Sequence, residues 1–187
     1  MNKNSQSGFT LVELLIVAIM LATLAAIVVP QFSSTTTEGE EAALKSNLAG
    51  IRAAIELYKQ QHGEYPAVNV SSGGTCTGGT AGTGAVDTDA ALLEQLTNYT
   101  NKQGQSCTLP VAGSFKFGPY LKEKAMPENP ITGSAAVVIV ARGNAASGNL
   151  AMAGDGAAGG WKYDPASGIF IANDTNTDSS AKRYDSY

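Results

Sequence analysis

The sequence has one histidine, two cysteines and few charged residues, which make up 15% of its 187 positions. The one imidazole, His62, lies at a predicted helix end without the partners that a catalytic or metal role would need, and no Ser/His/Asp, Cys/His or H-E-x-x-H arrangement appears, so we do not expect an enzyme. The 12 basic residues are outnumbered by 16 acidic residues, giving a formal net charge of −4. Because no basic stripe is present to neutralise phosphates, direct nucleic-acid binding by one chain is not expected.

The two cysteines, Cys76 and Cys107, lie in loop-like sequence without a C-x-x-C motif or a neighbouring histidine. This pattern argues against zinc and favours a disulfide in an oxidising compartment, with two free thiols in a reducing compartment as the alternative. A bond between them closes a loop in a glycine-rich stretch and contributes about 3–4 kcal/mol through chain entropy. The overall length fits one domain with one additional element.

The main feature present is an apolar run at residues 14–29, interrupted only by Thr23. With the apolar residues that precede it, the run reaches about 20 residues, which is enough to cross a bilayer as a helix. Glu13 lies at its start, where a carboxylate in hydrocarbon costs about 2.5–3.5 kcal/mol unless a cation compensates it. Three interpretations compete: a cleaved secretory signal, a plain membrane anchor, or a retained helix whose leader is removed before Phe9.

The third interpretation is favoured by the segment GFTLVE at residues 8–13, which follows a short leader containing Lys3 and precedes Pro30. This combination resembles the processing site of the type IV prepilin family. The resemblance implies cleavage by a prepilin peptidase after Gly8 and methylation of the new N-terminus at Phe9. It also implies that assembly depends on four positions: Phe9, Thr10, Glu13 and Pro30.

In that family Glu13 pairs with the new α-amine of a neighbouring subunit, so the resemblance supplies the cation that the apolar run lacks. Cleavage before Phe9 creates this amine. The alternative is that Glu13 reaches toward the lipid headgroups from the end of the helix.

Beyond Pro30 a second pattern appears, in which apolar residues recur at steps of four and three: Leu44, Leu48, Ile51, Ile55 and Tyr58. This spacing places them on one face of a helix, and His62-Gly63 provides a stop. The sequence therefore predicts a helix from about Phe9 to His62, roughly 80 Å long, with a bend expected at Pro30 and Gly39. The predicted segments are a leader (1–8), a transmembrane and assembly helix (9–30), an amphipathic half (31–62) and a globular head (63–187).

Within the head, residues 63–86 are predicted to be loop because of their glycine content. A short helix is expected at 87–97, capped by Asp87 or Thr88, and a buried strand at 137–140. Residues 161–163 and 169–171 flank a turn and predict a hairpin. The expected fold class is α+β, with the long helix packed on a small antiparallel sheet, as in the pilin fold.

The head also resembles the major pseudopilin of type II secretion, through GPYL at 118–121, MPENP at 126–130 and GWKYDP at 160–165. That family binds calcium near its C-terminus, so the resemblance implies a structural calcium as the one candidate cofactor. Asp174, Asn176 and Asp178 offer oxygen atoms at alternating positions. The glycine and the downstream glutamate of a calcium loop are missing, so a solvated acidic tail is favoured over a calcium site.

The two resemblances together imply a structural subunit of a helical filament, most similar to a type II secretion pseudopilin that helps to export proteins across the outer membrane. The expected partners are further copies, minor pilins or pseudopilins, the prepilin peptidase and an inner-membrane assembly platform. The expected location is the inner membrane, crossed once, with a periplasmic head that later joins a periplasmic or surface filament. One alternative is a type IV pilin for adhesion, twitching or DNA uptake. A different class, an exported enzyme or binding module with a signal or anchor, remains open.

Overall fold

The structure is a computed structural model that describes residues 9–144, 146–156 and 159–187, without the side chains of residues 29–35. Packing divides the chain into two units. The first ends at Gly39, and the second runs from Glu40 to Tyr187. Helix α1, Leu11–His62, contributes residues to both units.

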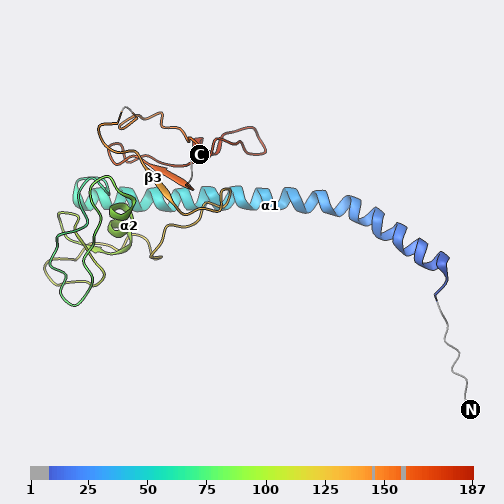
Figure 1. The fold of residues 1–187 in the computed structure, drawn as a ribbon, viewed down its shortest axis with the longest axis horizontal. Coiled ribbons are helices and arrows are strands. Elements are labelled where there is room, and N and C mark those ends of the chain that lie inside the picture. Colours follow the sequence, from blue (N-terminus) through green and yellow to red (C-terminus); the bar gives the residue numbers. More distant parts are fainter. Residues whose placement is uncertain (1–8, 145, 157–158) are drawn as a thin grey trace, which may run out of the picture. The chain divides into compact units, whose positions relative to one another are not determined.

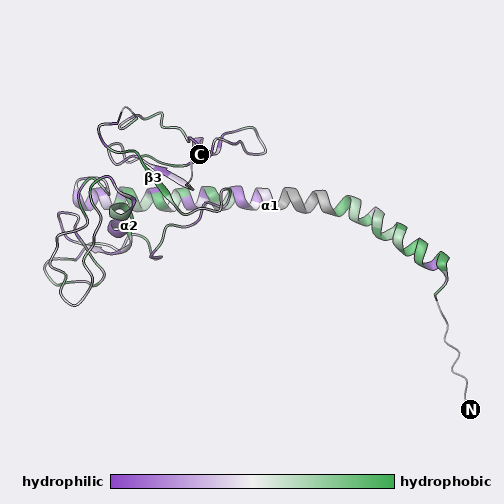
Figure 2. Ribbon diagram, in the orientation of Figure 1, coloured by the Kyte–Doolittle hydropathy of each residue, from purple (hydrophilic) through white to green (hydrophobic). Residues whose placement is uncertain are grey.

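Helix α1 confirms the predicted long helix, with its ends within two residues of the expected ones (Figure 1). Figure 2 shows a strongly apolar first part and a second part in which apolar and polar residues alternate. Gly63 ends the helix by adopting a φ of 89° and donating its N–H to the Lys59 carbonyl at 2.7 Å, as glycine does at helix C-termini. The helical backbone continues through Pro30 and Gly39. The bend expected at Pro30 and Gly39 stays a prediction.

The second unit is built around the apolar face of α1. All five residues that the sequence spacing placed on this face are buried: Leu44, Leu48, Ile51, Ile55 and Tyr58. They pack in one cluster with residues of the short helix and the sheet, chiefly Leu92, Leu96, Trp161, Tyr163 and Phe170. Burial of this face, rather than intrinsic helix propensity, is what stabilises the second half of α1.

Helix α2, Asp89–Thr97, confirms the predicted short helix. Of the two candidate caps, Thr88 is the one used: its Oγ1 accepts a hydrogen bond from the Ala91 N–H at 3.2 Å. Asp87 instead lies in the left-handed region with a φ of 55° and forms a 2.8 Å ion pair with Arg142. In the structure α2 lies beside α1, and its apolar residues join the same core (Figure 1).

The main sheet has three strands in the order β3-β4-β5: Val137–Ile139, Trp161–Tyr163 and Phe170–Ala172. Strands β4 and β5 form the predicted antiparallel hairpin, with Trp161 opposite Ala172. The expectation of a wholly antiparallel sheet is wrong, because β3 pairs with β4 in parallel. The long connection between these two strands lets the chain return to the same end of the sheet, which a parallel pair requires. Strand β3 is half-buried rather than buried as expected.

A second, two-stranded sheet was not predicted from the sequence. Strands β1, Tyr99–Thr100, and β2, Ser106–Cys107, form an antiparallel pair. A single 3₁₀ turn, η1, Tyr184–Ser186, lies near the end of the chain, where Tyr184 packs into the core. The α+β class, with a long apolar helix and small sheets, is confirmed, and the main sheet is mixed.

Candidate functional site: the start of α1 and the loops of the second unit

The first turn of α1 is closed by reciprocal hydrogen bonds between Thr10 and Glu13. The Thr10 N–H and hydroxyl donate to Glu13 Oε2 at 2.8 and 2.7 Å, and the Glu13 N–H donates to Thr10 Oγ1 at 3.3 Å. This is a capping box, in which two backbone donors at a helix start are satisfied by side chains. The signal, Thr-x-x-Glu before an apolar run, was in the sequence but was missed because Glu13 was considered only as a charge in lipid.

The helix segment after this cap is apolar and unpartnered. Residues Leu11–Val28 have a mean hydropathy of 2.8 and none of them is buried. Thr23, the one polar residue between Leu14 and Val28, donates its hydroxyl to the Met20 carbonyl at 2.9 Å, so this hydroxyl is hydrogen-bonded without water. By length and composition this helix can cross a membrane, although a signal sequence passes the same test.

The residues predicted for processing and assembly are placed only in part. Phe9 is 84% exposed immediately before the capping box, so it and Glu13 lie at the same end of the apolar helix. Gly8 and the side chain of Pro30 lie outside the described residues. Cleavage, methylation and pairing with a neighbouring copy therefore stay predictions.

Cys76 and Cys107 form a disulfide, with their Cα atoms 5.5 Å apart. The bond joins the glycine-rich loop to strand β2. The described part of the chain contains no free cysteine.

Two neighbouring residues of α2, Glu94 and Gln95, hold the loops of the second unit. The buried Gln95 side chain accepts from the Ala67 N–H at 2.6 Å and donates to the Asn69 and Gly104 carbonyls, both at 2.9 Å. Partial burial opposes the charge on Glu94, but hydrogen bonds from Ser71, Gly84 and Thr83 outweigh it and lower the pKa of this carboxyl. Neither residue was predicted from the sequence, because a polar residue on a short helix is normally solvent-facing.

His62 is a packing residue rather than a free imidazole. Its ring stacks on Tyr58 with centroids 4.0 Å apart, and its Nε2 lies 3.0 Å from both the Tyr120 and the Thr100 hydroxyls. Burial lowers the pKa of His62, and the Lys102 charge lowers it further, against the opposing effect of the Lys102 carbonyl. The neutral imidazole is therefore the form that the fold favours.

The oxygen-bearing residues near the C-terminus are engaged with donors. Asp174 Oδ1 accepts from the backbone and side-chain N–H groups of Asn176, both at 2.8 Å. Asp178 accepts from the N–H groups of Ser180 and Lys182, both at 2.8 Å, and from the Tyr187 hydroxyl. A calcium ion would have to displace these hydrogen bonds, so calcium binding here stays a prediction. The favoured expectation of a solvated tail is wrong for Asp174, which is buried.

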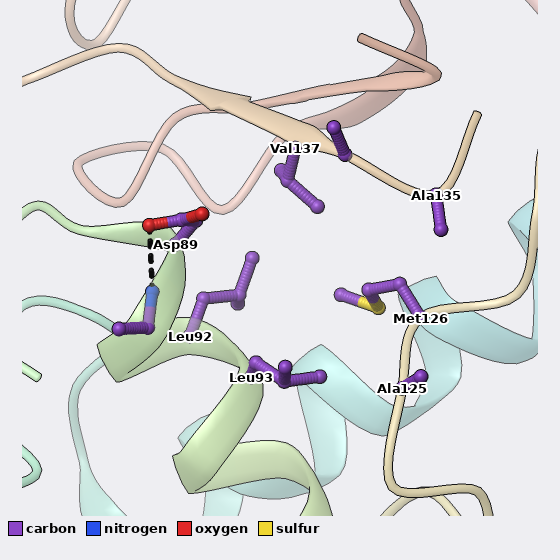
Figure 3. A pocket seen from close by; sticks show the side chains of 9 residues that line it. Asp89, Leu92, Leu93, Ala125, Met126, Ala135 and Val137 are labelled. Carbon is purple, nitrogen blue, oxygen red and sulfur yellow. Dashed lines mark hydrogen bonds between the residues drawn. The ribbon is translucent and has the colours of Figure 1, made fainter.

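An apolar groove of about 440 Å³ lies between the start of α2, the segment around Met126 and strand β3. Figure 3 shows Leu92, Leu93, Met126 and Val137 lining this space, with Asp89 at its edge. Asp89 is the one titratable group among the lining residues, and its carboxylate accepts from the Ala90 N–H at 2.9 Å. The groove therefore lacks the pair of groups that acid–base or nucleophilic catalysis needs.

Comparison with known proteins finds a family motif in the N-terminal segment. The prokaryotic N-terminal methylation motif matches residues 3–29. The chain is 39% identical over 67 residues to the type II secretion system core protein G of Pseudomonas aeruginosa, covering 36% of this chain and 47% of the relative. It is 33% identical over 66 residues to core protein G of Aeromonas hydrophila, covering 35% and 46%.

A fimbrial protein is also similar. The chain is 35% identical over 68 residues to the fimbrial protein of Neisseria meningitidis serogroup A, covering 36% of this chain and 40% of the relative. The chain thus spans less than half the length of these curated relatives. No solved structure matches the chain. The motif and the relatives confirm the similarity to type IV pilin-like proteins and to the major pseudopilin of type II secretion.

Proposed function

We propose that this chain is a structural subunit of a helical filament of the type IV pilus class, and specifically a pseudopilin of a type II secretion system. The observation that carries the proposal is the fully exposed apolar helix Leu11–Val28, directly behind a capped first turn and within the matched methylation motif. In a membrane this apolar surface contacts apolar lipid tails, which is favourable. Outside the membrane the same surface would be exposed to water, so other copies of the helix must cover it. Identical helices covering one another without closing a ring give an open, helical assembly.

In the proposed precursor the leader is removed after Gly8 by a prepilin peptidase, and Phe9 is methylated. The new α-amine then pairs with Glu13 of an adjacent copy, which removes an isolated charge from the apolar core of the filament. The precursor has no such amine, because Phe9 is still in a peptide bond. Until cleavage, the Thr10 donors are the partners of the carboxylate. Glu13 therefore has a partner at both stages.

The location follows from the same features. The apolar helix spans the inner membrane once, and the head (residues 63–187) lies in the periplasm, where the disulfide of Cys76 and Cys107 persists. Minor pseudopilins and an inner-membrane assembly platform complete the filament. The role is structural, and any calcium at Asp174, Asn176 and Asp178 would stabilise the fold rather than take part in a reaction.

A second candidate function is a surface pilin. The similarity to a fimbrial protein and the disulfide-bonded, glycine-rich loop favour it. Deletion of the gene separates the two functions, with exoprotein secretion and surface fibres measured in the same cells. Lost secretion with intact fibres supports the pseudopilin, whereas lost fibres with intact secretion supports the pilin and rejects our choice.

The filament class itself is tested by mass spectrometry of the purified protein. A mature chain that begins at N-methylated Phe9 supports the proposal, and one that begins at Met1 or within the apolar run supports an anchored or secreted protein of another class. Glu13→Val provides the assembly test. We expect the variant to be inserted into the membrane and cleaved, but not to form filaments when it is the only copy of the subunit present. A normal filament yield would refute the charge pairing.

A further inference from the structure

The glycine-rich loop from Ser71 to Gly84 has its two ends bonded to each other. The Ser71 N–H donates to the Gly84 carbonyl at 3.0 Å, and the Gly84 N–H donates to Ser71 Oγ at 2.8 Å. A compact loop with adjoining ends is an Ω-loop. Its Ser71 and Gly84 ends form a neck, and Cys76 lies between them.

Glu94, on α2 and outside the loop, is hydrogen-bonded to this neck. Its carboxylate accepts from the Gly84 N–H at 3.1 Å, from the Thr83 N–H and hydroxyl at 2.9 and 3.0 Å, and from the Ser71 hydroxyl. These donors come from both ends of the loop. No ion pair of Glu94 occurs among the described residues, so the negative charge of its carboxylate is stabilised by N–H and O–H donors. Hydrogen bonds to an ionised acceptor are the strong ones.

The returning arm of the loop is aligned with strand β2. The Gly82 N–H donates to the Ser106 carbonyl at 2.9 Å, and the Thr108 N–H donates to the Thr80 carbonyl at 3.0 Å. Both bonds flank Cys107, which forms an isolated bridge with Ala81. Noncovalent contacts, in addition to the disulfide, therefore hold the loop against the strand that carries the second cysteine.

We propose that Glu94 is the positioning residue for the Cys76–Cys107 disulfide, closing the loop neck before the cysteines are oxidised so that the two thiols are held at high effective concentration. Without the clamp, a 14-residue glycine-rich segment samples many conformations, and few of them bring the thiols together. When Glu94 is hydrogen-bonded to the neck, these bonds offset the entropy lost on ordering the loop, and they do not depend on the sulfur atoms. The inference concerns folding of the second unit and does not rest on the filament proposal.

The redox step is a thiol–disulfide exchange with a small disulfide, for which oxidised glutathione is the probe. One cysteine thiolate attacks a glutathione sulfur and releases a glutathione thiolate. The second cysteine then attacks the mixed disulfide and releases another. The two protein thiols lose two electrons and two protons, and two molecules of reduced glutathione are formed. The equilibrium constant of this exchange is the effective concentration of the two thiols.

The test is to measure that constant for the full chain in detergent micelles, in glutathione buffers of graded composition, for the native sequence and for Glu94→Gln. Glutamine keeps the size but presents an amide donor to partners that are all donors. We expect the effective concentration to fall about tenfold or more, because bonds to a charged acceptor are lost. Glu123→Gln, which changes an exposed acid outside the loop and α2, is the matched control and should equal the native protein.

A general loss of folding is separated from a local effect by hydrogen exchange on the reduced proteins. In reduced Glu94→Gln, we expect the amides of Thr83 and Gly84, which donate to Glu94, and of Gly82, which donates to Ser106, to exchange faster, while amides of Ile51 to Tyr58 in α1 keep their protection. The milder Thr83→Val, which removes only one hydroxyl donor, should give an intermediate effective concentration. If Glu94→Gln and Glu123→Gln both match the native effective concentration, or if the amides of Gly82, Thr83 and Gly84 in the reduced native protein are unprotected, the inference is overturned.

Discussion

Thr10 and Glu13 satisfy each other across the first turn of α1, each supplying the acceptor for the other's backbone N–H. Glu13 therefore has a local role in starting the helix, in addition to the role in assembly that we propose. The two roles draw on the same carboxylate. A change at Thr10 should affect helix initiation and assembly without removing the charge, which makes Thr10 the informative position.

The first prediction is that Thr10→Val reduces filament yield while leaving membrane insertion and cleavage intact. Valine has the shape of threonine, but its side chain neither caps the Glu13 N–H nor donates to the Glu13 carboxylate, and the loss of such a cap costs about 0.5–2 kcal/mol. Filament yield is measured by sedimentation of sheared filaments. The control is Thr23→Val, which removes a hydroxyl bonded only to the Met20 carbonyl within the same apolar helix. Equal yields for the two variants would argue against a special role for the cap.

The second prediction concerns the buried face of α1. Leu48 is 1% exposed and Leu57 is 44% exposed on the same helix. Leu48→Ala leaves a cavity in the core and should lower the free energy of unfolding by about 2–5 kcal/mol, whereas Leu57→Ala should cost well under half as much. Urea denaturation of the full chain in detergent, followed by tryptophan fluorescence, measures both because Trp161 lies in that core. A similar loss for both variants would contradict the assigned face.

Helix α1 could be predicted from the sequence for a physical reason. The spacing of Leu44, Leu48 and Ile51 is a local pattern that reports directly which side of a helix is buried. The cap of α2, expected at Asp87 or Thr88, and the hairpin of β4 and β5 are also local, and they were predicted for that reason. The expectation of an antiparallel sheet was wrong for β3, which pairs with β4 in parallel, since parallel or antiparallel pairing depends on the path of a distant connection.

The residues that were missed in the candidate site share a different property. Glu94 and Gln95 are polar residues of a short helix, and their partners are backbone groups in loops far from them in sequence. Backbone donors and acceptors are present at almost every position, so they leave no signal in the sequence that identifies a partner. The disulfide could be anticipated because its two members are rare residues of one type.

The third prediction is a loss of stability between about pH 7.5 and 5.5 that depends on His62. Its burial lowers the pKa of the imidazole below the ordinary value of about 6.5. As the pH falls through the pKa that His62 has in the unfolded chain, the unfolded chain binds a proton there while the folded chain does not, so unfolding becomes more favourable. The stabilisation is therefore complete above that value and declines below it.

Urea denaturation at several pH values measures this loss, and His62→Gln is the comparison. The chain has no other histidine, so the variant should be less stable overall but should show a much flatter dependence on pH within this window. Acidic residues with depressed pKa values, such as Glu94, titrate below it. An unchanged pH profile in His62→Gln would assign the effect to another group.

The fourth prediction uses two glycines that share a backbone conformation but differ in surroundings. Gly168 and Gly113 have φ values of 77° and 79°. A Cβ on Gly168 would overlap the ring of Tyr65, whereas a Cβ on Gly113 would have nothing within 4 Å. Alanine at either site pays the same conformational penalty of about 1 kcal/mol for the left-handed region, so the difference between the variants isolates the steric clash.

Gly168 closes the turn between β4 and β5, donating its N–H to the Asp164 carbonyl at 2.8 Å. The Tyr65 ring cannot move away freely, because Lys59 lies 3.8 Å from its centroid and its hydroxyl donates to Glu56 at 3.3 Å. We therefore expect Gly168→Ala to be less stable than Gly113→Ala by about 1–3 kcal/mol, the usual cost of forcing extra volume into a packed site. Thermal unfolding of the two variants measures the difference. Equal melting temperatures would mean that Tyr65 rotates away, and Tyr65→Ala combined with Gly168→Ala should then show no rescue.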